Sequence, residues 1–300
     1  MICTLGIYYP WAKANIKRYL YSSTYLDDYS FEFHGTGKQM FIGLVRFLVI
    51  SLLAFSALEI IVVFIPENIE QDIFLGRFLD LAILIPYMPI LALFIHGARK
   101  YRMSRTSYRG IRFGYRGKKK TLVLLLLENS LITLITLGIY YPWFTNNVRK
   151  YVYRNARFGN IKLRFSGNSS DYADIVILGW ILTFFTLGIY YFWFKKKLFK
   201  FFYENISFGR NEDVVNIKTS VTGGKYFKLI SVNWLILLFT LGLGYPIAKV
   251  RSMYFIADNL ELYGNIDLDN ITQTEENYAN ATGDAYNTDD SGDFFDLDIL

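Results

Sequence analysis

Long apolar stretches alternate with basic, polar stretches along this chain. The apolar residues gather in five blocks, at residues 41–65, 78–95, 121–141, 175–194 and 229–245. A helix needs about 20 mostly apolar residues to cross a hydrocarbon core of roughly 30 Å. The pattern therefore predicts a mainly α-helical integral membrane protein, with a multi-pass bundle of helices.

The polar stretches between the blocks each read as a basic amphipathic helix, a turn and a short strand. In the expected strands, apolar residues occupy every second position, which is typical of a half-buried strand. The alternating residues are Phe31 and Phe33; Ile111, Phe113 and Tyr115; Ile161, Leu163 and Phe165; Val215 and Ile217. We therefore expect short β-strands in the polar loops of the bundle.

The chain also resembles itself at a spacing of about 50 residues. Residues Arg149–Gly167 overlay Arg99–Gly117 without a gap, and the same unit recurs at Lys17–Gly35 and, with an insertion, from Lys200. A period of this length corresponds to one supersecondary unit. The sequence thus predicts a bundle built from repeats.

One octapeptide marks these repeats. "TLGIYYPW" stands at Thr4–Trp11 and Thr136–Trp143, "TLGIYYFW" at Thr186–Trp193 and "TLGLGYPI" at Thr240–Ile247. Glycine allows a bend, proline suits the first turn of a helix, and Tyr and Trp suit a membrane–water interface. We interpret the motif as a structural hinge with an interfacial anchor; a ligand-binding aromatic cluster is the alternative. The hinge residues are Gly6, Pro10, Trp11, Gly138, Pro142, Trp143, Gly188, Trp193, Gly242 and Pro246.

The path of the chain through the membrane has two solutions. If every block crosses once, residues Thr145–Asp174 carry six Lys and Arg to the outer face, against the positive-inside rule. One short strand would then lie alone there, without a partner to pair with. Alternatively, each motif turns the chain back as a helical hairpin, although Arg149 and Lys150 would then need interior partners. Five simple crossings is the simpler hypothesis.

Charge separates the chain into two regions. Of its 300 residues, 53% are hydrophobic and only 19% are charged. Residues 1–257 contain all 32 Lys and Arg against 14 of the 26 acidic residues, whereas residues 258–300 contain the other 12 acidic residues and no Lys or Arg. We expect residues 1–257 to form the membrane domain and the acidic tail to be disordered. The first motif copy has no preceding helix, so we expect a shortened or variant N-terminus.

Three polar residues inside apolar blocks are candidate functional sites. Glu128 lies within "LLLLENSLITL", and a carboxylate inside a membrane helix is costly. Asn129 and Asn233 each precede a motif threonine, Thr136 or Thr240, by seven residues, which places each pair on one helix face. The asparagines either join helices by hydrogen bonds or line a polar path, and both roles are open for Glu128.

Few residues are available for catalysis or metal binding. The chain has one cysteine, Cys3, and two histidines, His34 and His96, and it lacks the common nucleotide-binding, hydrolase and metalloprotease motifs. We expect no metal, no cofactor and no enzymatic activity. The basic runs Lys118–Lys120 and Lys195–Lys197 adjoin apolar helices, so we expect them to contact anionic lipid head groups rather than nucleic acid.

The repeated octapeptide, the sequences "AKANIKRYLYSST" and "FTNNVRKYVYRN" that follow it, and the strand sequence "FGNIKLRFSG" resemble the YjgN-like family of bacterial inner-membrane proteins. The resemblance covers most of residues 1–257. It implies a multi-pass protein of the bacterial inner membrane, of a group without a characterised biochemical function and without catalytic residues to carry over.

Two functions are consistent with these observations. The first is a membrane protein that binds or transports a small solute or lipid, since many transporters are built from repeats. The alternative is a structural or regulatory membrane protein that does not transport, with a basic face toward lipid or a partner protein. Neither the ligand nor the oligomeric state follows from the sequence.

Overall fold

The computed structural model describes residues 7–62, 87–210, 213–264 and 271–274. Three expectations lie outside these residues: the role of Gly6, the first half of the second apolar block, and the disorder of most of the tail. The chain divides into two compact units, which are described separately: unit 1 comprises Met1–Phe144, Asn155–Asn160 and Thr272–Asp296, and unit 2 comprises Thr145–Arg154, Ile161–Ile271 and Leu297–Leu300.

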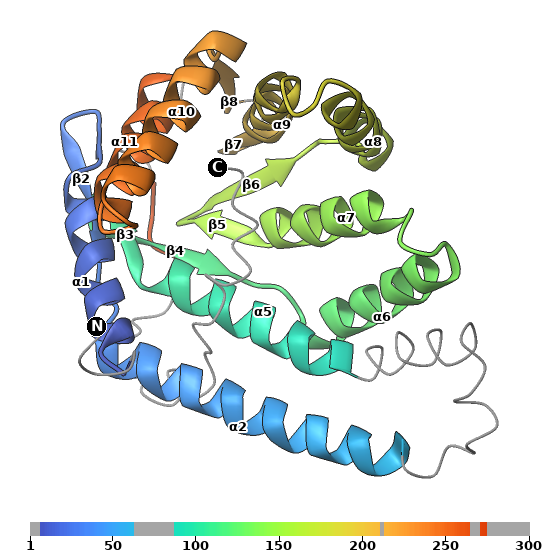
Figure 1. Cartoon of the computed structure of the whole chain (residues 1–300). Helices are drawn as coiled ribbons and strands as arrows, with labels where there is room; N and C mark the ends of the chain where they lie inside the picture. Colours follow the sequence, from blue (N-terminus) through green and yellow to red (C-terminus); the bar gives the residue numbers. More distant parts are fainter. Residues whose placement is uncertain (1–6, 63–86, 211–212, 265–270, 275–300) are drawn as a thin grey trace. The chain divides into compact units, whose positions relative to one another are not determined.

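Unit 1 combines helices with short antiparallel strands (Figure 1). Strands β1 to β5 pair in chain order, each with the next. The described elements are α1 (Tyr9–Ser22), β1 (Tyr25–Leu26), β2 (Tyr29–Phe33), α2 (Gly37–Val62), α5 (Met88–Ser104), β3 (Thr106–Tyr108), β4 (Ile111–Tyr115), α6 (Lys119–Ile135) and β5 (Ala156–Phe158).

The strands of unit 1 form tight hairpins because two turn residues adopt positive φ. Between β3 and β4 these are Arg109 (φ 50°) and Gly110 (φ 76°), and Tyr108 pairs with Ile111 across them. Two consecutive residues with positive φ define the type I′ turn, whose twist matches that of paired strands. The sequence pattern predicted only the second strand of each hairpin, so β3 is an addition to the expected fold.

Unit 2 follows the same order of elements. Its strands β6, β7, β8 and β9 also pair antiparallel in chain order. The elements are α7 (Tyr141–Arg154, from Thr145 onward), β6 (Ile161–Phe165), α8 (Ser169–Phe185), α9 (Tyr191–Glu204), β7 (Ile206–Arg210), β8 (Asp213–Thr219), α10 (Gly223–Phe239), α11 (Tyr245–Asp258) and β9 (Leu260–Tyr263).

Aromatic side chains dominate the core of unit 2. One cluster joins the end of β6 to α8 and α9 through Phe165, Tyr172, Phe194 and Phe202. A second cluster joins α9 to α10, where Phe199 and Tyr226 are almost fully buried. Large rings bury much apolar area per residue, so they can fix helices of only 14 to 17 residues against short strands.

The three motif copies that the structure describes in full each form the turn between two helices. At the end of α8, Leu187 (φ 50°) donates its N–H to the Phe184 carbonyl at 3.1 Å, and Gly188 (φ 92°) donates to Thr183 at 2.8 Å. These two bonds define the Schellman motif, which satisfies the last carbonyls of a helix. The same pattern occurs at Leu137–Gly138 and at Leu241–Gly242.

The motif threonine connects the two helices of each hairpin. Thr186 Oγ1 donates to the Leu182 carbonyl at 2.7 Å and accepts the N–H of Tyr190 at 2.9 Å. Thr240 Oγ1 does the same with Ile236 and Gly244, at 2.6 and 2.7 Å. One hydroxyl thus satisfies the end of the first helix and the start of the second.

The α8–α9 hairpin matches the second solution, in which the motif turns the chain back, rather than a single crossing at this block. β6 precedes α8, β7 follows α9, and these two strands pair along Phe165↔Ile206, so α8–α9 begins and ends at one sheet. Of the two basic residues expected to need interior partners, Arg149 has aromatic ones: its guanidinium lies 3.9 Å from the Phe202 ring centre and donates to the Tyr172 hydroxyl at 3.4 Å. A net crossing at α8–α9 is incompatible with this pairing.

Only one helix in the described part of the chain is long and apolar enough to cross a membrane by length and composition. This segment of α2, Gly37–Ala57, has 21 residues and a mean hydropathy of 2.2. Only 11% of an 18-residue stretch within it is buried. Helices α6, α8 and α10 stop at 17 residues because the motif turn ends them.

Candidate ligand pocket in the last helical hairpin

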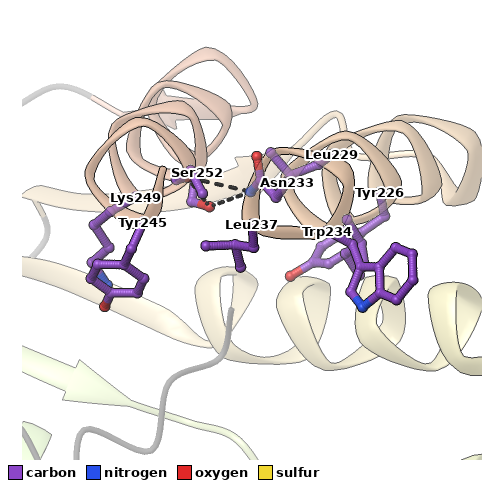
Figure 2. Close-up of a pocket in the computed structure, with 10 residues that line it drawn as sticks. Tyr226, Leu229, Asn233, Trp234, Leu237, Tyr245, Lys249 and Ser252 are labelled. Atoms are coloured by element: carbon purple, nitrogen blue, oxygen red, sulfur yellow. Dashed lines mark hydrogen bonds between the residues drawn. The ribbon is translucent and has the colours of Figure 1, made fainter. Parts of the chain in front are cut away.

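A pocket of about 270 Å³ lies between the two helices of the last hairpin, α10 and α11 (Figure 2). Its lining is mostly apolar, and the polar groups come from one face of each helix. The lining residues are Tyr226, Leu229, Ile230, Asn233, Trp234, Leu237, Tyr245, Ala248, Lys249 and Ser252.

Asn233 is positioned by two hydrogen bonds across the hairpin. Its amide nitrogen donates to the Ala248 carbonyl at 3.3 Å and to Ser252 Oγ at 3.1 Å, as the dashed lines in Figure 2 indicate. Its Oδ1 is buried and accepts no hydrogen bond from any described residue. A buried acceptor without a donor costs free energy, about 1–3 kcal/mol, which a bound donor would recover.

Lys249 and Tyr226 add charge and a hydroxyl donor to the pocket. Lys249, on α11, lies beside Tyr245 in Figure 2 and makes no ion pair with the residues that the structure describes. Burial, followed by the nearby Tyr203 and Tyr191, raises the pKa of Tyr226 well above its ordinary value near 10. The Tyr226 hydroxyl therefore keeps its proton at neutral pH and can donate a hydrogen bond.

A second pocket, of about 280 Å³, is lined by other residues of α10 and α11 and shares Leu229 with the first. It is basic, since Lys225, Lys228 and Arg251 contribute three cations against the single carboxylate of Asp258. Lys225 Nζ donates to Asn259 Oδ1 at 2.8 Å and is therefore partly engaged. The hairpin thus carries one mostly apolar pocket and one pocket with a basic lining.

The three polar candidates from the sequence lie in different surroundings. Asn233 lines the apolar pocket and joins α10 to α11, whereas Asn129 is buried on α6 and donates to the Leu125 carbonyl of its own helix at 2.7 Å. Glu128 is exposed on α6 and lines neither of the two pockets. The structure therefore brings only Asn233 to the candidate site.

The hinge glycines lie in the loops between the paired helices, and the hinge prolines and tryptophans lie in the first helical turn after each loop. Gly138, Gly188 and Gly242 all have positive φ, between 87° and 92°. Pro10, Trp11, Pro142, Trp143, Trp193 and Pro246 lie in the first turns of α1, α7, α9 and α11.

Lys249 and Ser252 complete the pocket, and the sequence reasoning did not single them out. A signal for Lys249 was available, because Lys13, Lys195 and Lys249 occupy the same place relative to three copies of the motif. Lys13 and Lys195 each lie over the tyrosine four residues earlier, at 5.4 and 5.6 Å from the ring centre. Ser252 has no comparable pattern and is found only through its contact with Asn233.

Among the residues that the structure describes, no group of three or more His, Cys, Asp or Glu side chains converges. The pocket residues offer hydrogen bonding, apolar contact and a positive charge. Such groups suit the binding of an amphipathic molecule.

Comparison with known proteins assigns this chain to a family of bacterial proteins. The family model described as a bacterial protein of unknown function, DUF898, matches residues 1–164, 160–212 and 210–288. The inner membrane protein YjgN of Salmonella typhimurium is 29% identical over 112 residues, which are 37% of this chain and 25% of that protein. The chain therefore spans about a quarter of the length of this relative. No solved structure matches the chain.

The family match extends over nearly all of the described residues, including the four motif copies and the hairpin that holds the pocket. The chain therefore belongs to the DUF898 family of bacterial proteins and is YjgN-like.

Proposed function

We propose that this chain is an inner-membrane protein that binds a lipid or another small amphiphile between α10 and α11. One observation carries the proposal: the pocket is apolar, yet it contains a buried acceptor, Asn233 Oδ1, and a cation, Lys249, to which no described residue is bonded. Leu229 and Leu237 would contact the apolar part of the ligand, while Lys249 would pair with an anionic group.

The size of the pocket limits the ligand. Pockets for drug-sized molecules occupy about 300–1,000 Å³, and this one holds about 270 Å³. We therefore expect it to accept part of an acyl chain or one small amphiphile, with the remainder of a larger lipid outside. The proposal involves binding alone and no catalysed reaction.

The proposed location rests on two further observations. The relative from Salmonella typhimurium bears the name inner membrane protein. Helix α2 has the length and hydropathy to cross a bilayer, and most of its apolar side chains are exposed in the described chain. We propose that α2 anchors the protein in the bacterial inner membrane.

The test is purification of the full chain in mild detergent, followed by native mass spectrometry and by analysis of organic and aqueous extracts. We expect a lipid or amphiphile adduct that falls severalfold in Lys249→Gln and in Asn233→Leu. Lys162→Gln is the matched control, because Lys162 is an exposed cation on β6 outside both pockets. Adducts that stay unchanged in both pocket variants would contradict the proposal.

The basic pocket favours a second candidate function, a structural or regulatory protein that holds anionic lipid without moving a ligand. Its three cations, Lys225, Lys228 and Arg251, match the charge of phosphate head groups. Bound lipid that depends on Lys228→Gln and Arg251→Gln, and not on Lys249→Gln, would support this candidate over the first.

A further inference from the structure

The strand pairing in unit 2 restricts how its hairpins can meet a membrane. β6 and β7 flank α8–α9 and pair with each other, and β8 and β9 flank α10–α11 and pair with each other. Each hairpin therefore leaves the sheet and returns to it. The strands before and after a hairpin must lie on the same side of any bilayer that the hairpin enters.

The turns of these hairpins expose apolar side chains to an unusual degree. Leu187 is 95% exposed and Leu241 is 92% exposed. Their neighbours are similar, since Phe184, Phe185, Ile189, Phe239 and Leu243 are all exposed. Such groups of apolar residues at the tips of two hairpins of one unit indicate an interaction surface rather than an ordinary protein surface.

Backbone strain at the same leucines points to a function for this surface. Leu187 and Leu241 occupy the left-handed position that Gly or Asn usually fills, at φ 50° and 49°. The left-handed conformation is strained for a residue with a Cβ. At such exposure these leucines gain almost nothing from the rest of the chain. Transfer of a leucine side chain out of water is favourable by more than this strain costs, so an apolar environment would offset the strain.

Tryptophan and lysine side chains indicate how far from each hairpin tip the apolar environment would extend. Trp180 and Trp234 are exposed and lie five residues before the last residue of α8 and α10. Lys195 and Lys249 lie one helical turn into α9 and α11. At 1.5 Å per residue, both pairs are about 6–8 Å from the helix ends. Tryptophan and lysine are the residues that favour the membrane interface.

The lysines on the second helix of a hairpin argue against deeper insertion of that hairpin into the membrane. Lys195, Lys196, Lys197 and Lys200 lie on α9, and none of them is fully buried. A lysine at the centre of a bilayer is energetically costly. Helices that lie at the interface insert only about 5–10 Å into it, which matches the distance from the tips to the Trp and Lys residues.

We infer that the α8–α9 and α10–α11 hairpins dip their tips into the acyl chains of one membrane leaflet, without crossing it, and that the Trp180, Trp193, Trp234, Lys195 and Lys249 side chains lie at the head groups. The strands β6 to β9 all stay on one aqueous side. This inference concerns the surface of unit 2 and holds whether or not a ligand occupies the pocket.

Cysteine labelling of the full chain in its membrane tests the inference. Cys3→Ser removes the one natural cysteine, and single cysteines then replace Lys162, Asn216 and Glu261 on three strands, or Leu187 and Leu241 at the tips. A membrane-impermeant maleimide is applied to spheroplasts and to inverted vesicles. We expect the three strand positions to react from the same side, and the two tips to react from neither side until detergent is added.

A fluorophore measures the depth of the tips. After attachment of an environment-sensitive dye at Leu187→Cys or Leu241→Cys, we expect quenching by spin labels on acyl chains and little quenching by aqueous iodide. The same dye at Leu262→Cys, an exposed leucine on β9, is the control and should show the reverse. Strand positions that react from opposite sides, or tips that iodide quenches as well as the control, would overturn the inference. Protection of the tips that persists in lipid-free detergent would place a protein there and would also overturn it.

Discussion

Leu187 and Leu241 combine a strained backbone with a side chain that touches little of the protein. In each of these Schellman turns two consecutive residues have positive φ, and the glycine adopts such a φ without strain. The leucine does not. At the scale of single residues, the choice of leucine therefore costs stability in the isolated protein, and it is explained by contacts outside it.

Leu187→Asn should separate the two effects. Asparagine tolerates the left-handed conformation better than leucine, and loss of the exposed leucine removes no core contact. We expect the melting temperature in detergent to stay the same or rise slightly. Gly188→Leu places a Cβ at φ 92°, with open space around it, and should destabilise by about 1–2 kcal/mol. A large loss of stability in Leu187→Asn would contradict this account.

His96 predicts how stability depends on pH. Its side chain is buried on α5, and burial, followed by Lys119 and Lys100, lowers its pKa from 6.5 to about 4. The unfolded chain therefore takes up a proton between pH 6.5 and 4 where the folded chain does not. The contribution of His96 to stability should therefore be fully present above pH 6.5 and be lost progressively as the pH falls toward 4.

Thermal melts in detergent at a series of pH values measure this effect. His96→Gln removes the titrating group, so the fall in melting temperature between pH 6.5 and 4 should become smaller than in the parent protein. An identical pH profile in the variant would exclude His96 as the cause.

At the scale of elements, each hairpin depends on how closely its two helices approach. Asn129, Gly179 and Asn233 each lie seven residues before the motif threonine. In α10 the position carries a hydrogen bond to α11, while in α8 it carries no side chain and the Phe194 ring of α9 packs against it. The same position thus holds a hairpin together by two different means.

Gly179→Leu should open the α8–α9 hairpin. Even a Cβ at this position would lie closer than contact distance to Phe194, so the ring must move, and overpacking of this kind costs about 1–3 kcal/mol. Gly224→Leu is a control within α10, where nothing lies near the added Cβ. We expect a melting temperature several degrees lower for Gly179→Leu only, and equal values for both variants would contradict the packing argument.

Thr186→Val tests the connection between the helices. Valine keeps the shape of threonine but cannot accept the N–H of Tyr190. Loss of a comparable helix-capping bond costs about 0.5–2 kcal/mol. The free energy of unfolding should fall by that amount. In contrast, Thr274→Val, which removes a hydroxyl bond to the Gly159 carbonyl within unit 1, should leave the α8–α9 hairpin of unit 2 intact in hydrogen-exchange measurements.

The sequence predicted the helices better than the path of the chain. Apolar blocks located α2, α6, α8 and α10, and alternation located β2, β4, β6 and β8. It did not locate β3 or β7, because a strand of three to five residues after a helix is too short for a period of two to stand out. Hydropathy alone also cannot distinguish a crossing helix from the first half of a hairpin, since that difference depends on hydrogen bonds within the turn.

The pocket was only partly predictable. Asn233 followed from its spacing to Thr240, since both lie on one face of α10. Lys249 and Ser252 belong to the next helix, and their approach to Asn233 depends on the angle between α10 and α11. That angle results from the packing of Phe199, Tyr226 and Phe255, which are distant in sequence.

At the scale of the whole molecule, the two units differ in the kind of apolar surface that each offers to a membrane. α2 has the composition of a spanning helix, whereas the hairpins of unit 2 combine apolar tips with basic second helices. We expect the full chain to stay with the membrane after alkaline extraction because of α2. Leu48→Arg with Leu53→Arg, at two exposed positions within α2, should release a large part of it into the soluble fraction. Retention of this double variant would show that other segments anchor the chain.

The pairing of strands in chain order has a consequence for biosynthesis. Within each unit, every strand that the structure describes pairs with the strand made just before it or just after it. No strand has to wait for a distant segment of the polypeptide to leave the ribosome. At about 5–20 residues per second, the roughly 50 residues from one strand pair to the next emerge within a few seconds. The nascent chain can therefore add each new strand to the strand that was made just before it. The loss or gain of one hairpin with its strand in evolution would leave the pairing of the earlier strands unchanged.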